Sequence, residues 1–244
     1  MDIPGRTIVV AGAAGHLGSA VAAALTDRGA NVAGFDLRAS GEGSQDTSTV
    51  RADAADETSA VAAVDEIEKR FGTIDALVNC SGLIHSEPLV NLTNPQRRRH
   101  GIQTWDAVIR ANLTAAFVLG SVVAERMAAA RTKGAIVQFS SIAASGNPGQ
   151  TAYSAAKAGI EALTRVWARE LGPLGIRVVA IAPGFVDTPS TRDAVNEAAL
   201  GELKRKTPLR RLAAPAEVAS AVLFALESDF LTGCTLHVDG GLVL

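Results

Sequence analysis

Short apolar segments alternate with longer segments of helical spacing along the whole chain of 244 residues. Parallel strands joined by crossover helices produce this alternation, and right-handed crossovers lay the helices on both faces of one sheet. The sequence therefore predicts an α/β protein, built as one domain over residues 1–244, with a doubly wound, seven-stranded and mostly parallel sheet. We expect strands at Thr7–Ala11, Asn31–Phe35, Thr49–Ala52, Ile74–Asn79, Ala135–Phe139, Arg177–Ala182 and Thr235–Val238, and helices at Leu17–Arg28, Thr58–Phe71, Thr104–Ala130, Ala152–Leu171 and Pro215–Leu226.

A glycine-rich turn joins the first expected strand to the first expected helix. Glycine lets the backbone turn tightly and approach a pyrophosphate, while the start of the helix offers free N–H groups and the positive end of its dipole. A tight corner alone would also use glycine, but the position at the first strand–helix junction favours dinucleotide binding. The turn consists of Gly12-Ala13-Ala14-Gly15-His16-Leu17-Gly18.

Asp36 ends the second expected strand, 24 residues after Gly12. At about this spacing a carboxylate accepts hydrogen bonds from the adenosine ribose of a dinucleotide. The same negative charge repels a 2′-phosphate, so the sequence predicts NAD rather than NADP. Arg38 leaves the alternative open, because its guanidinium could swing in and tolerate the phosphate.

Tyr153 is the only tyrosine of the chain, and Lys157 stands four residues after it. On a helix these positions share one face, about 5–6 Å apart. An ammonium beside a phenol favours the phenolate, so we expect the pKa of Tyr153 to fall below its usual value of about 10. Such a tyrosine can pass a proton to or from an alcohol or carbonyl oxygen. The alternative, a half-buried tyrosine beside a solvated lysine, is disfavoured by the other motifs.

Together these segments resemble the short-chain dehydrogenase/reductase family, in its short, single-domain branch, and the resemblance covers essentially the whole chain. The family's glycine motif corresponds to Ala11–Gly18, its Tyr-x-x-x-Lys pair to Tyr153 and Lys157, and its Pro-Gly-x-x-x-Thr motif to Pro183–Thr188. The segment Val238–Gly241 matches the family's closing pattern. The resemblance implies a Rossmann fold and hydride transfer between a nicotinamide cofactor and a carbon that bears oxygen.

The resemblance also implies which residues hold the cofactor. Asp53 and Ala54 would contact the adenine ring, and the segment around Val186 with the Thr188 hydroxyl would hold the nicotinamide carboxamide. Asn79-Cys80-Ser81-Gly82 stands where the family has a related glycine-ended motif. The full set is Gly12, Gly15, His16, Leu17, Gly18, Asp36, Leu37, Asp53, Ala54, Asn79, Ser81, Gly82, Tyr153, Lys157, Pro183, Gly184, Val186 and Thr188.

By the same resemblance the catalytic residues are Asn112, Ser141, Tyr153 and Lys157. Tyr153 would exchange the proton, and Lys157 would lower its pKa and hold the nicotinamide ribose. Ser141 would steady the oxyanion, and Asn112 would support a proton path through water. The family's serine most often precedes the tyrosine by thirteen residues, the position of Ser140. A one-residue deletion in the following loop favours Ser141, and both serines stay candidates.

Composition narrows the partners and the compartment. The formal net charge of −2 gives no general case for binding nucleic acid or an anionic membrane surface. We expect no membrane span, because no apolar run reaches the required length, and no signal peptide. Cys80 and Cys234 lie in different motifs, so we expect no disulfide and a cytoplasmic protein. The histidines and cysteines show no metal-ligand spacing, so we expect no metal.

These features predict an NAD-dependent oxidoreductase that acts on a secondary alcohol or a ketone. By resemblance, Thr104–Ala130 and Ala152–Leu171 would pair with copies in a homotetramer. Two other functions stay open: an NADPH-dependent 3-oxoacyl thioester reductase of the same family, and a catalytically silent protein that senses dinucleotides. Neither the substrate nor the physiological direction follows from the sequence.

The segments expected to cover the substrate carry no signature that names it. Within them, Arg97-Arg98-Arg99-His100 is interpreted as a solvated basic loop, with a clamp for an anionic substrate group as the alternative. His85 could face the substrate or be an ordinary loop residue. We expect these covering segments to be loops, and they are His85–Gln103, Ala143–Gln150 and Asp187–Thr207.

Overall fold

The computed structural model describes residues 1–38, 48–96, 98–194 and 197–244. Within them, seven strands form one sheet in the order β3-β2-β1-β4-β5-β6-β7, and every neighbouring pair is parallel. The predicted doubly wound sheet is confirmed, and it is wholly rather than mostly parallel. The strands are β1 (Thr7–Ala11), β2 (Asn31–Asp36), β3 (Thr49–Arg51), β4 (Ala76–Asn79), β5 (Ala135–Phe139), β6 (Arg177–Pro183) and β7 (Thr235–Val238).

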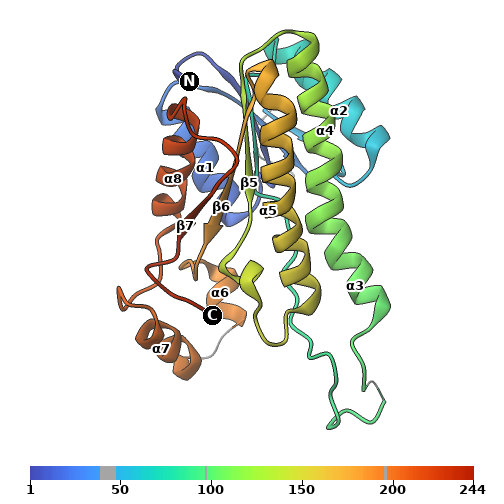
Figure 1. Ribbon diagram of the computed structural model, residues 1–244, viewed down its shortest axis with the longest axis vertical. Coiled ribbons are helices and arrows are strands. Elements are labelled where there is room, and N and C mark those ends of the chain that lie inside the picture. Colours follow the sequence, from blue (N-terminus) through green and yellow to red (C-terminus); the bar gives the residue numbers. More distant parts are fainter. Residues whose placement is uncertain (39–47, 97, 195–196) are drawn as a thin grey trace.

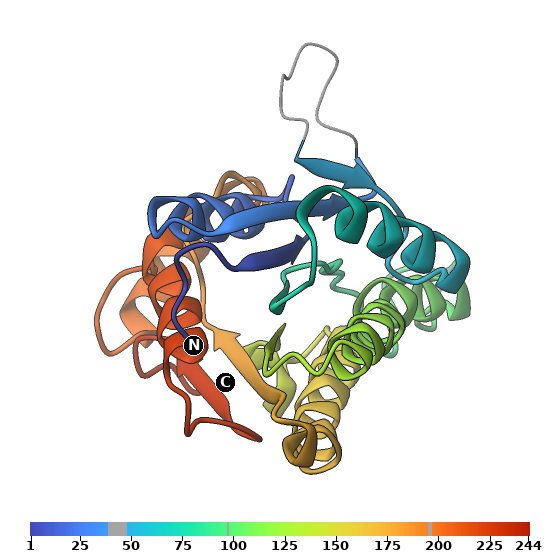
Figure 2. The same cartoon turned by 90° about the horizontal axis from the view of Figure 1, so that it is seen from above.

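Helices cover both faces of the sheet (Figure 1). One face carries α1 (His16–Asp27) and α8 (Pro215–Glu227), and the other carries α2 (Glu57–Phe71), α4 (Ala115–Ala129) and α5 (Thr151–Leu171), as the view from above shows (Figure 2). All residues of β1 and β5 are buried, because a strand enclosed on both faces has no side that meets solvent. Two apolar clusters result, one on each face of the sheet.

Local signals set the helix ends, and the predicted boundaries agree with the observed ones within one or two residues. At the start of α2, the Asp56 carboxylate accepts a hydrogen bond from the N–H of Ser59 at 2.8 Å, as an N-cap does. At its end, Gly72 adopts a φ of +79°, which glycine tolerates best. These residues are visible in the sequence, which is why the boundaries were predictable.

The predicted helix Thr104–Ala130 consists of α3 (Ile102–Ile109), a π-helical turn (Arg110–Thr114) and α4. By length and composition this stretch could cross a membrane, with a mean hydropathy of 1.7, so our expectation that no apolar run is long enough is wrong. The mean hydropathy refers to an 18-residue window of this stretch, and half of that window is buried within the fold, where α4 packs against α2 and the sheet. Such burial is typical of a core helix.

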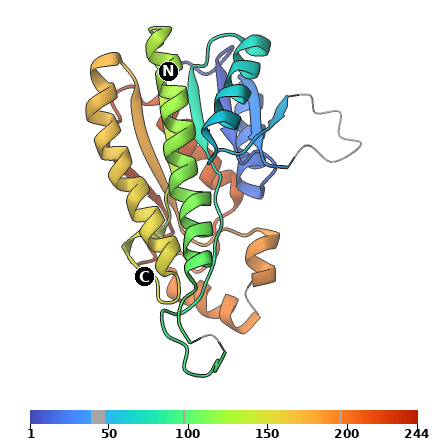
Figure 3. The same cartoon turned by 90° about the vertical axis from the view of Figure 1, so that its right-hand side faces the viewer.

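Two segments project from the carboxyl end of the sheet, at the bottom of Figures 1 and 3. The first is residues 83–101, here called the lobe. An antiparallel bridge between Val90 and Arg99 closes the lobe on itself. The N–H of Glu87 donates to the carbonyl of Gly149 at 2.7 Å, which attaches the lobe to the segment before α5.

The second projecting segment contains α6 (Pro189–Ala194) and α7 (Glu197–Lys206), so the prediction of a loop at Asp187–Thr207 is wrong. Charge placement explains α7. It has an acidic residue in its first turn and basic residues in its last turn, which complements the helix dipole. Lys206 lies 3.5 Å from Glu202, one turn earlier. None of its side chains is fully buried, and Leu200 and Leu203 are partly buried, so the surface charges support a helix with little core contact.

Candidate active site

The carboxyl ends of β1 to β6 meet at one edge of the sheet, and most predicted site residues lie there. The strand order reverses at β1, which lies between β2 and β4. In open α/β sheets, ligands bind in the crevice at such a switch point. We call the segments after β1, β2 and β3 the nucleotide side, and the segments after β4, β5 and β6 together with α5 the catalytic side.

The glycine-rich turn packs so closely that side chains cannot be added to it. Gly12 has a φ of +75°, and a Cβ there would lie 2.9 Å from the backbone nitrogen of Ser81. A Cβ on Gly18 would lie 2.0 Å from the carbonyl oxygen of Gly12. Gly15 is the N-cap of α1 and offers no side-chain cap, so the first N–H groups of the helix can hold an anion such as a pyrophosphate. His16 and Leu17 begin this helix.

Asp36 lies at the end of β2, with only 6% of its side chain exposed. Its carboxylate accepts hydrogen bonds from the N–H groups of Ala14 at 3.0 Å and Arg38 at 2.9 Å, so it ties the turn to β2. The Arg38 guanidinium is largely exposed, and a Cβ on Gly15 would lie 4.0 Å from its Nη2. A negative and a positive charge therefore both border the turn. The neighbouring Leu37 side chain is exposed.

Asp53 and Ala54 follow β3 on the same side, and Ala54 is buried. One carboxylate oxygen of Asp53 accepts a hydrogen bond from the N–H of Ala55 at 2.8 Å. The other oxygen pairs with Arg110 at 2.7 Å. Arg110 opens the π-helical turn and is 57 positions away in the chain, so no local pattern indicates this partner.

A buried polar network fixes the segment after β4. The Asn79 side chain donates to Gln138 at 3.0 Å and accepts from the N–H of Ser81 at 3.1 Å. The Ser81 hydroxyl also donates to it, at 2.5 Å. The sequence analysis missed Gln138, although one polar residue in an otherwise apolar strand was a usable signal. The network holds the backbone of Ser81 against Gly12.

The segment after β6 forms the far wall of the catalytic side. A Cβ on Gly184 would lie 2.8 Å from the Cα of Asp239, so only glycine fits there. The Thr188 hydroxyl is buried and lies 3.0 Å from the Thr191 hydroxyl. Pro183 and Val186 are also buried.

Tyr153 and Lys157 lie one turn apart in α5, and both are buried, with 7% and 3% exposed. The Lys157 ammonium lies 5.4 Å from the centre of the Tyr153 ring, so the predicted common helix face is confirmed. The same ammonium donates a hydrogen bond to the carbonyl of Phe139 at 2.8 Å. This contact joins the end of β5 to α5 at the centre of the catalytic side.

The predicted fall of the Tyr153 pKa is wrong for the protein alone. Burial raises the pKa of Tyr153 to about 12, and a side-chain hydrogen bond with Ser141 opposes that rise only in part. Burial also lowers the pKa of Lys157 to about 8, which the nearby Cys80 opposes. Sequence spacing shows which groups meet, whereas the pKa depends on the water that they lose. At neutral pH Tyr153 is therefore a phenol with a proton to donate.

Asn112 lies in the π-helical turn with 1% of its surface exposed. Its Nδ2 donates to the carbonyl oxygens of Leu83 and Val108, each at 2.9 Å. Its Oδ1 is buried and has no hydrogen-bond partner within the described part of the chain. A buried acceptor left in this way costs about 1–3 kcal/mol, so a water or a ligand group is expected at this oxygen.

Gly82 packs closely against this oxygen. A Cβ on Gly82 would lie 2.6 Å from Asn112 Oδ1 and 3.4 Å from Lys157 Nζ. The backbone of Gly82 therefore lies close to both polar groups, and only a glycine fits there. The unpartnered oxygen and the uncapped glycine turn both fit a nicotinamide dinucleotide laid along the edge, with its phosphates at α1 and its reactive ring near Tyr153.

The two candidate serines have different surroundings. The Ser140 hydroxyl is buried, donates to Glu161 at 2.9 Å and lies 3.3 Å from the carbonyl oxygen of Lys157. Ser141 hydrogen-bonds the phenol of Tyr153. The structure thus brings Ser141 rather than Ser140 to the tyrosine. Glu161 was missed, although it lies one turn beyond Lys157 and continues the polar face of the helix.

The lobe carries a cluster of titratable side chains. The Glu87 carboxylate lies 3.5 Å from His100 Nδ1 and 3.6 Å from His85 Nε2. In the described ranges of the chain, no group of three or more such side chains could hold a metal ion. Of the basic segment, Arg98 and Arg99 are exposed, and Arg97 lies outside the described residues.

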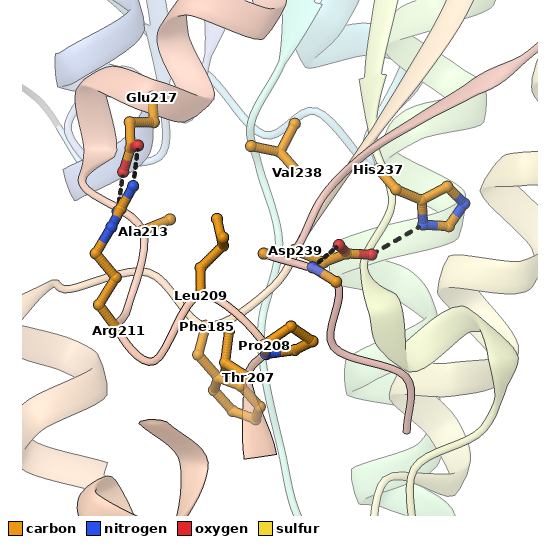
Figure 4. Close-up of a pocket in the computed structure, with 12 residues that line it drawn as sticks. Phe185, Thr207, Pro208, Leu209, Arg211, Ala213, Glu217, His237, Val238 and Asp239 are labelled. Carbon is orange, nitrogen blue, oxygen red and sulfur yellow. Dashed lines mark hydrogen bonds and ion pairs between the residues drawn. The ribbon is translucent and has the colours of Figure 1, made fainter. Parts of the chain in front are cut away.

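A cavity of about 490 Å³ lies at the carboxyl end of β7, next to the segment after β6. Residues 207–209 and 237–241 line it together with Phe185 (Figure 4). An ion pair between Arg211 and Glu217, at 2.6 Å, borders one side. The four predicted catalytic residues are not among those that line this cavity, so it is not the place of the expected chemistry.

Comparisons with known proteins find relatives along the whole chain. A family model described as enoyl-(acyl carrier protein) reductase matches residues 12–243. A 3-oxoacyl-[acyl-carrier-protein] reductase of Thermotoga maritima is 35% identical over 100% of both chains. An uncharacterised oxidoreductase of Schizosaccharomyces pombe is 34% identical, over 100% of this chain and 93% of that one. A short-chain reductase protein of Streptomyces niveus is 39% identical, over 74% of this chain and 68% of that one.

Proposed function

The chain belongs to the short-chain dehydrogenase/reductase family, and we propose that it transfers a hydride between NAD(H) and a secondary alcohol or ketone. One observation carries this proposal. Tyr153, Lys157 and the unpartnered oxygen of Asn112 lie together, buried, beside an uncapped glycine turn. A catalytically silent protein that only senses dinucleotides would have no need of this buried group.

Tyr153 exchanges the proton at the reacting oxygen. Burial holds its pKa at about 12, so at neutral pH it is protonated and suited to donate to a ketone oxygen, which favours the reductive direction. Ser141 hydrogen-bonds the phenol and stabilises the negative charge that develops on the substrate oxygen. When bound, the dinucleotide supplies or accepts the hydride.

Lys157 and Asn112 return the proton to Tyr153. The backbone of Gly82 lies close to both Lys157 Nζ and Asn112 Oδ1, and a water bound to Asn112 Oδ1 would satisfy this unpartnered oxygen. Lys157 would also hold the nicotinamide ribose, since its ammonium lies one turn from the phenol. The backbone near Val186 and the Thr188 hydroxyl would hold the carboxamide.

NAD is the cofactor we propose, because the buried Asp36 carboxylate lies beside the glycine turn and would repel a 2′-phosphate. Arg38 supports the alternative cofactor, since its guanidinium reaches the same turn. The nucleotide side would hold the phosphates on the N–H groups of α1 and the adenine beside Asp53 and Ala54. Comparing kcat/KM for the two reduced cofactors separates the alternatives.

A 3-oxoacyl thioester reductase that uses NADPH is the second candidate. The match to a reductase of that kind from Thermotoga maritima and the position of Arg38 both favour it. A free ketone and a 3-oxoacyl thioester, offered with each reduced cofactor, discriminate the two candidates. Turnover of the thioester with NADPH alone would replace the leading proposal by the second one.

We also propose a homotetramer and a cytoplasmic location. Phe117 of α4 and Val166 of α5 are about half exposed, as expected for side chains that pack against copies of the same helices. Cys80 and Cys234 are free thiols, in keeping with a reducing compartment. A mass from light scattering tests the assembly.

Replacing Tyr153 by phenylalanine tests the proposed chemistry. We expect turnover to fall by about 10³-fold or more, because general acid–base catalysis contributes on this scale. Binding of the reduced cofactor should stay within about threefold, since the ring remains and only the hydroxyl is lost. A panel of ketones, followed at the reduced-nicotinamide absorbance band, measures the first quantity, and fluorescence titration the second. Undiminished turnover would contradict the assignment.

A further inference from the structure

An ion pair borders the nucleotide side of the crevice and was not anticipated from the sequence. Arg110 Nη2 lies 2.7 Å from an oxygen of Asp53. Arg110 opens the π-helical turn that also carries Asn112, whereas Asp53 follows β3. The two side chains are 53% and 34% exposed, so the pair meets solvent rather than the core.

Both oxygens of the Asp53 carboxylate are held. Oδ1 accepts the N–H of Ala55 at 2.8 Å, and Oδ2 accepts from Arg110. An ionised carboxylate has about four acceptor sites, so two remain after these contacts. The group therefore cannot rotate without losing a contact, and it presents its remaining sites in fixed directions.

A second pair of the same kind makes the role of Arg110 clearer. Arg126 of α4 lies 2.7 Å from Asp65 of α2, on a part of the surface away from the strand ends. Both pairs connect the β3–α2 region to the long helix that follows the lobe. Exposed ion pairs add little stability. The Arg126–Asp65 pair already connects α2 to α4, so the Arg110 pair is not needed for that connection. Of these two pairs, the Arg110–Asp53 pair is the one that fixes a carboxylate within the crevice.

We infer that Arg110 determines specificity for the base of the dinucleotide. By fixing the Asp53 carboxylate, it makes the crevice bind adenine more tightly than a base that has a carbonyl in place of the adenine amine. The inference rests on the proposed function, in which Asp53 faces the adenine of the dinucleotide. A fixed carboxylate accepts a hydrogen bond from the amine and repels a carbonyl oxygen. A carboxylate free to rotate turns away from the carbonyl, so it discriminates less.

The test compares reduced NAD with reduced nicotinamide hypoxanthine dinucleotide, which differs by that carbonyl. The Kd of each is measured by nicotinamide fluorescence on the wild type, Arg110→Ala, Asp53→Ala and Arg126→Ala. We expect the wild type to prefer reduced NAD by about tenfold or more. Arg110→Ala should reduce this ratio by about threefold or more, and Asp53→Ala should bring it near one. Arg126→Ala, the matched control, should keep the wild-type ratio.

Several outcomes would overturn the inference. If Arg110→Ala keeps the wild-type preference for reduced NAD, the inference is overturned. A stronger preference for reduced NAD in Arg110→Ala also overturns it, because the guanidinium would then bind the carbonyl itself. Equal binding of both dinucleotides by the wild type overturns the inference while the proposed function stands. If the wild type binds neither dinucleotide, both this inference and the proposed function are overturned. Thermal unfolding is recorded for each variant, and Arg110→Gln replaces Arg110→Ala if the latter does not fold.

Discussion

The two sides of the crevice use polar groups in opposite ways. On the nucleotide side, Asp36 and Asp53 each accept a backbone N–H and each contact an arginine. On the catalytic side, Lys157 and Asn112 are almost fully buried. One has a lowered pKa, and the other has an oxygen without a partner in the described structure. Carboxylates whose hydrogen bonds are already made suit binding, whereas an ammonium with a lowered pKa and an oxygen without a partner suit chemistry.

This difference predicts how substitutions should divide. Changes to the proposed catalytic residues should cost much rate and little or no stability, because burying these polar groups destabilises the folded protein. Changes on the nucleotide side should alter cofactor preference modestly. The predictions below run from the largest expected effect to the smallest, and each would weaken the comparison if it failed.

Lys157→Met should give the largest effect, a fall in turnover of about 10³-fold or more, because the proton path and the ribose contact are both lost. Stability should not fall at neutral pH. Burial lowers the pKa of Lys157 from 10.5 to about 8, which corresponds to a cost of roughly 3 kcal/mol for keeping it charged. Removing that cost offsets the lost hydrogen bond to Phe139.

The pH dependence of unfolding checks the same prediction. Since the folded pKa lies below the unfolded one, the unfolded wild type binds more protons between about pH 8 and pH 10. Wild-type stability should therefore rise with pH in this window relative to Lys157→Met. Chemical denaturation at several pH values measures it, with Lys69→Met on the exposed face of α2 as control. Parallel curves for the wild type and Lys157→Met would show that the ammonium is not buried as described.

The two serines should separate rate from stability. Ser141→Ala should lower kcat by about 10²-fold, since it removes the hydrogen bond to Tyr153 and to the developing oxyanion. Ser140→Ala should lower the free energy of unfolding by about 1 kcal/mol, since it removes the contact with Glu161, and should affect kcat less. Steady-state kinetics and denaturation of both variants decide between them. The reverse order of kcat values would make Ser140 the catalytic serine.

Asp36→Ala should have the smallest effect on rate. The ratio of kcat/KM for NADH over NADPH should fall about tenfold, because the carboxylate no longer accepts from the ribose or repels a phosphate. The free energy of unfolding should change by about 1 kcal/mol, since the hydrogen bond from Ala14 is lost. Asp65→Ala on α2 is the control. An unchanged cofactor ratio would assign Asp36 to holding the turn alone.

The parts that the sequence predicted well are those whose signals are local. The alternating apolar segments gave the strands, and Gly12 with Asp36 placed the nucleotide side at the first two strand ends. The spacing of Tyr153 and Lys157 placed both on one helix face. Each of these features depends on residues a few positions apart, or on the topology that alternation imposes.

The parts that it missed depend on distant contacts and on burial. Gln138 meets Asn79 across 59 positions, and Arg110 meets Asp53 across 57. The pKa of Tyr153 moved opposite to the expectation because the fold removes water from the phenol, which spacing does not reveal. The segment Asp187–Thr207 was predicted as a loop although it contains α6 and α7, because α7 has no fully buried side chain that would mark it in the sequence.

The hydrogen atom that serves as the side chain of Gly82 has a consequence for protein engineering. Even one methyl group at this position would come within 2.6 Å of the Asn112 amide oxygen and would crowd the Lys157 ammonium at 3.4 Å. Libraries that diversify the nearby lobe to accept new substrates can vary residues from Leu83 onward. The codon for residue 82 has to be left unchanged, because any larger residue would displace the Asn112 amide from its place in the reaction centre.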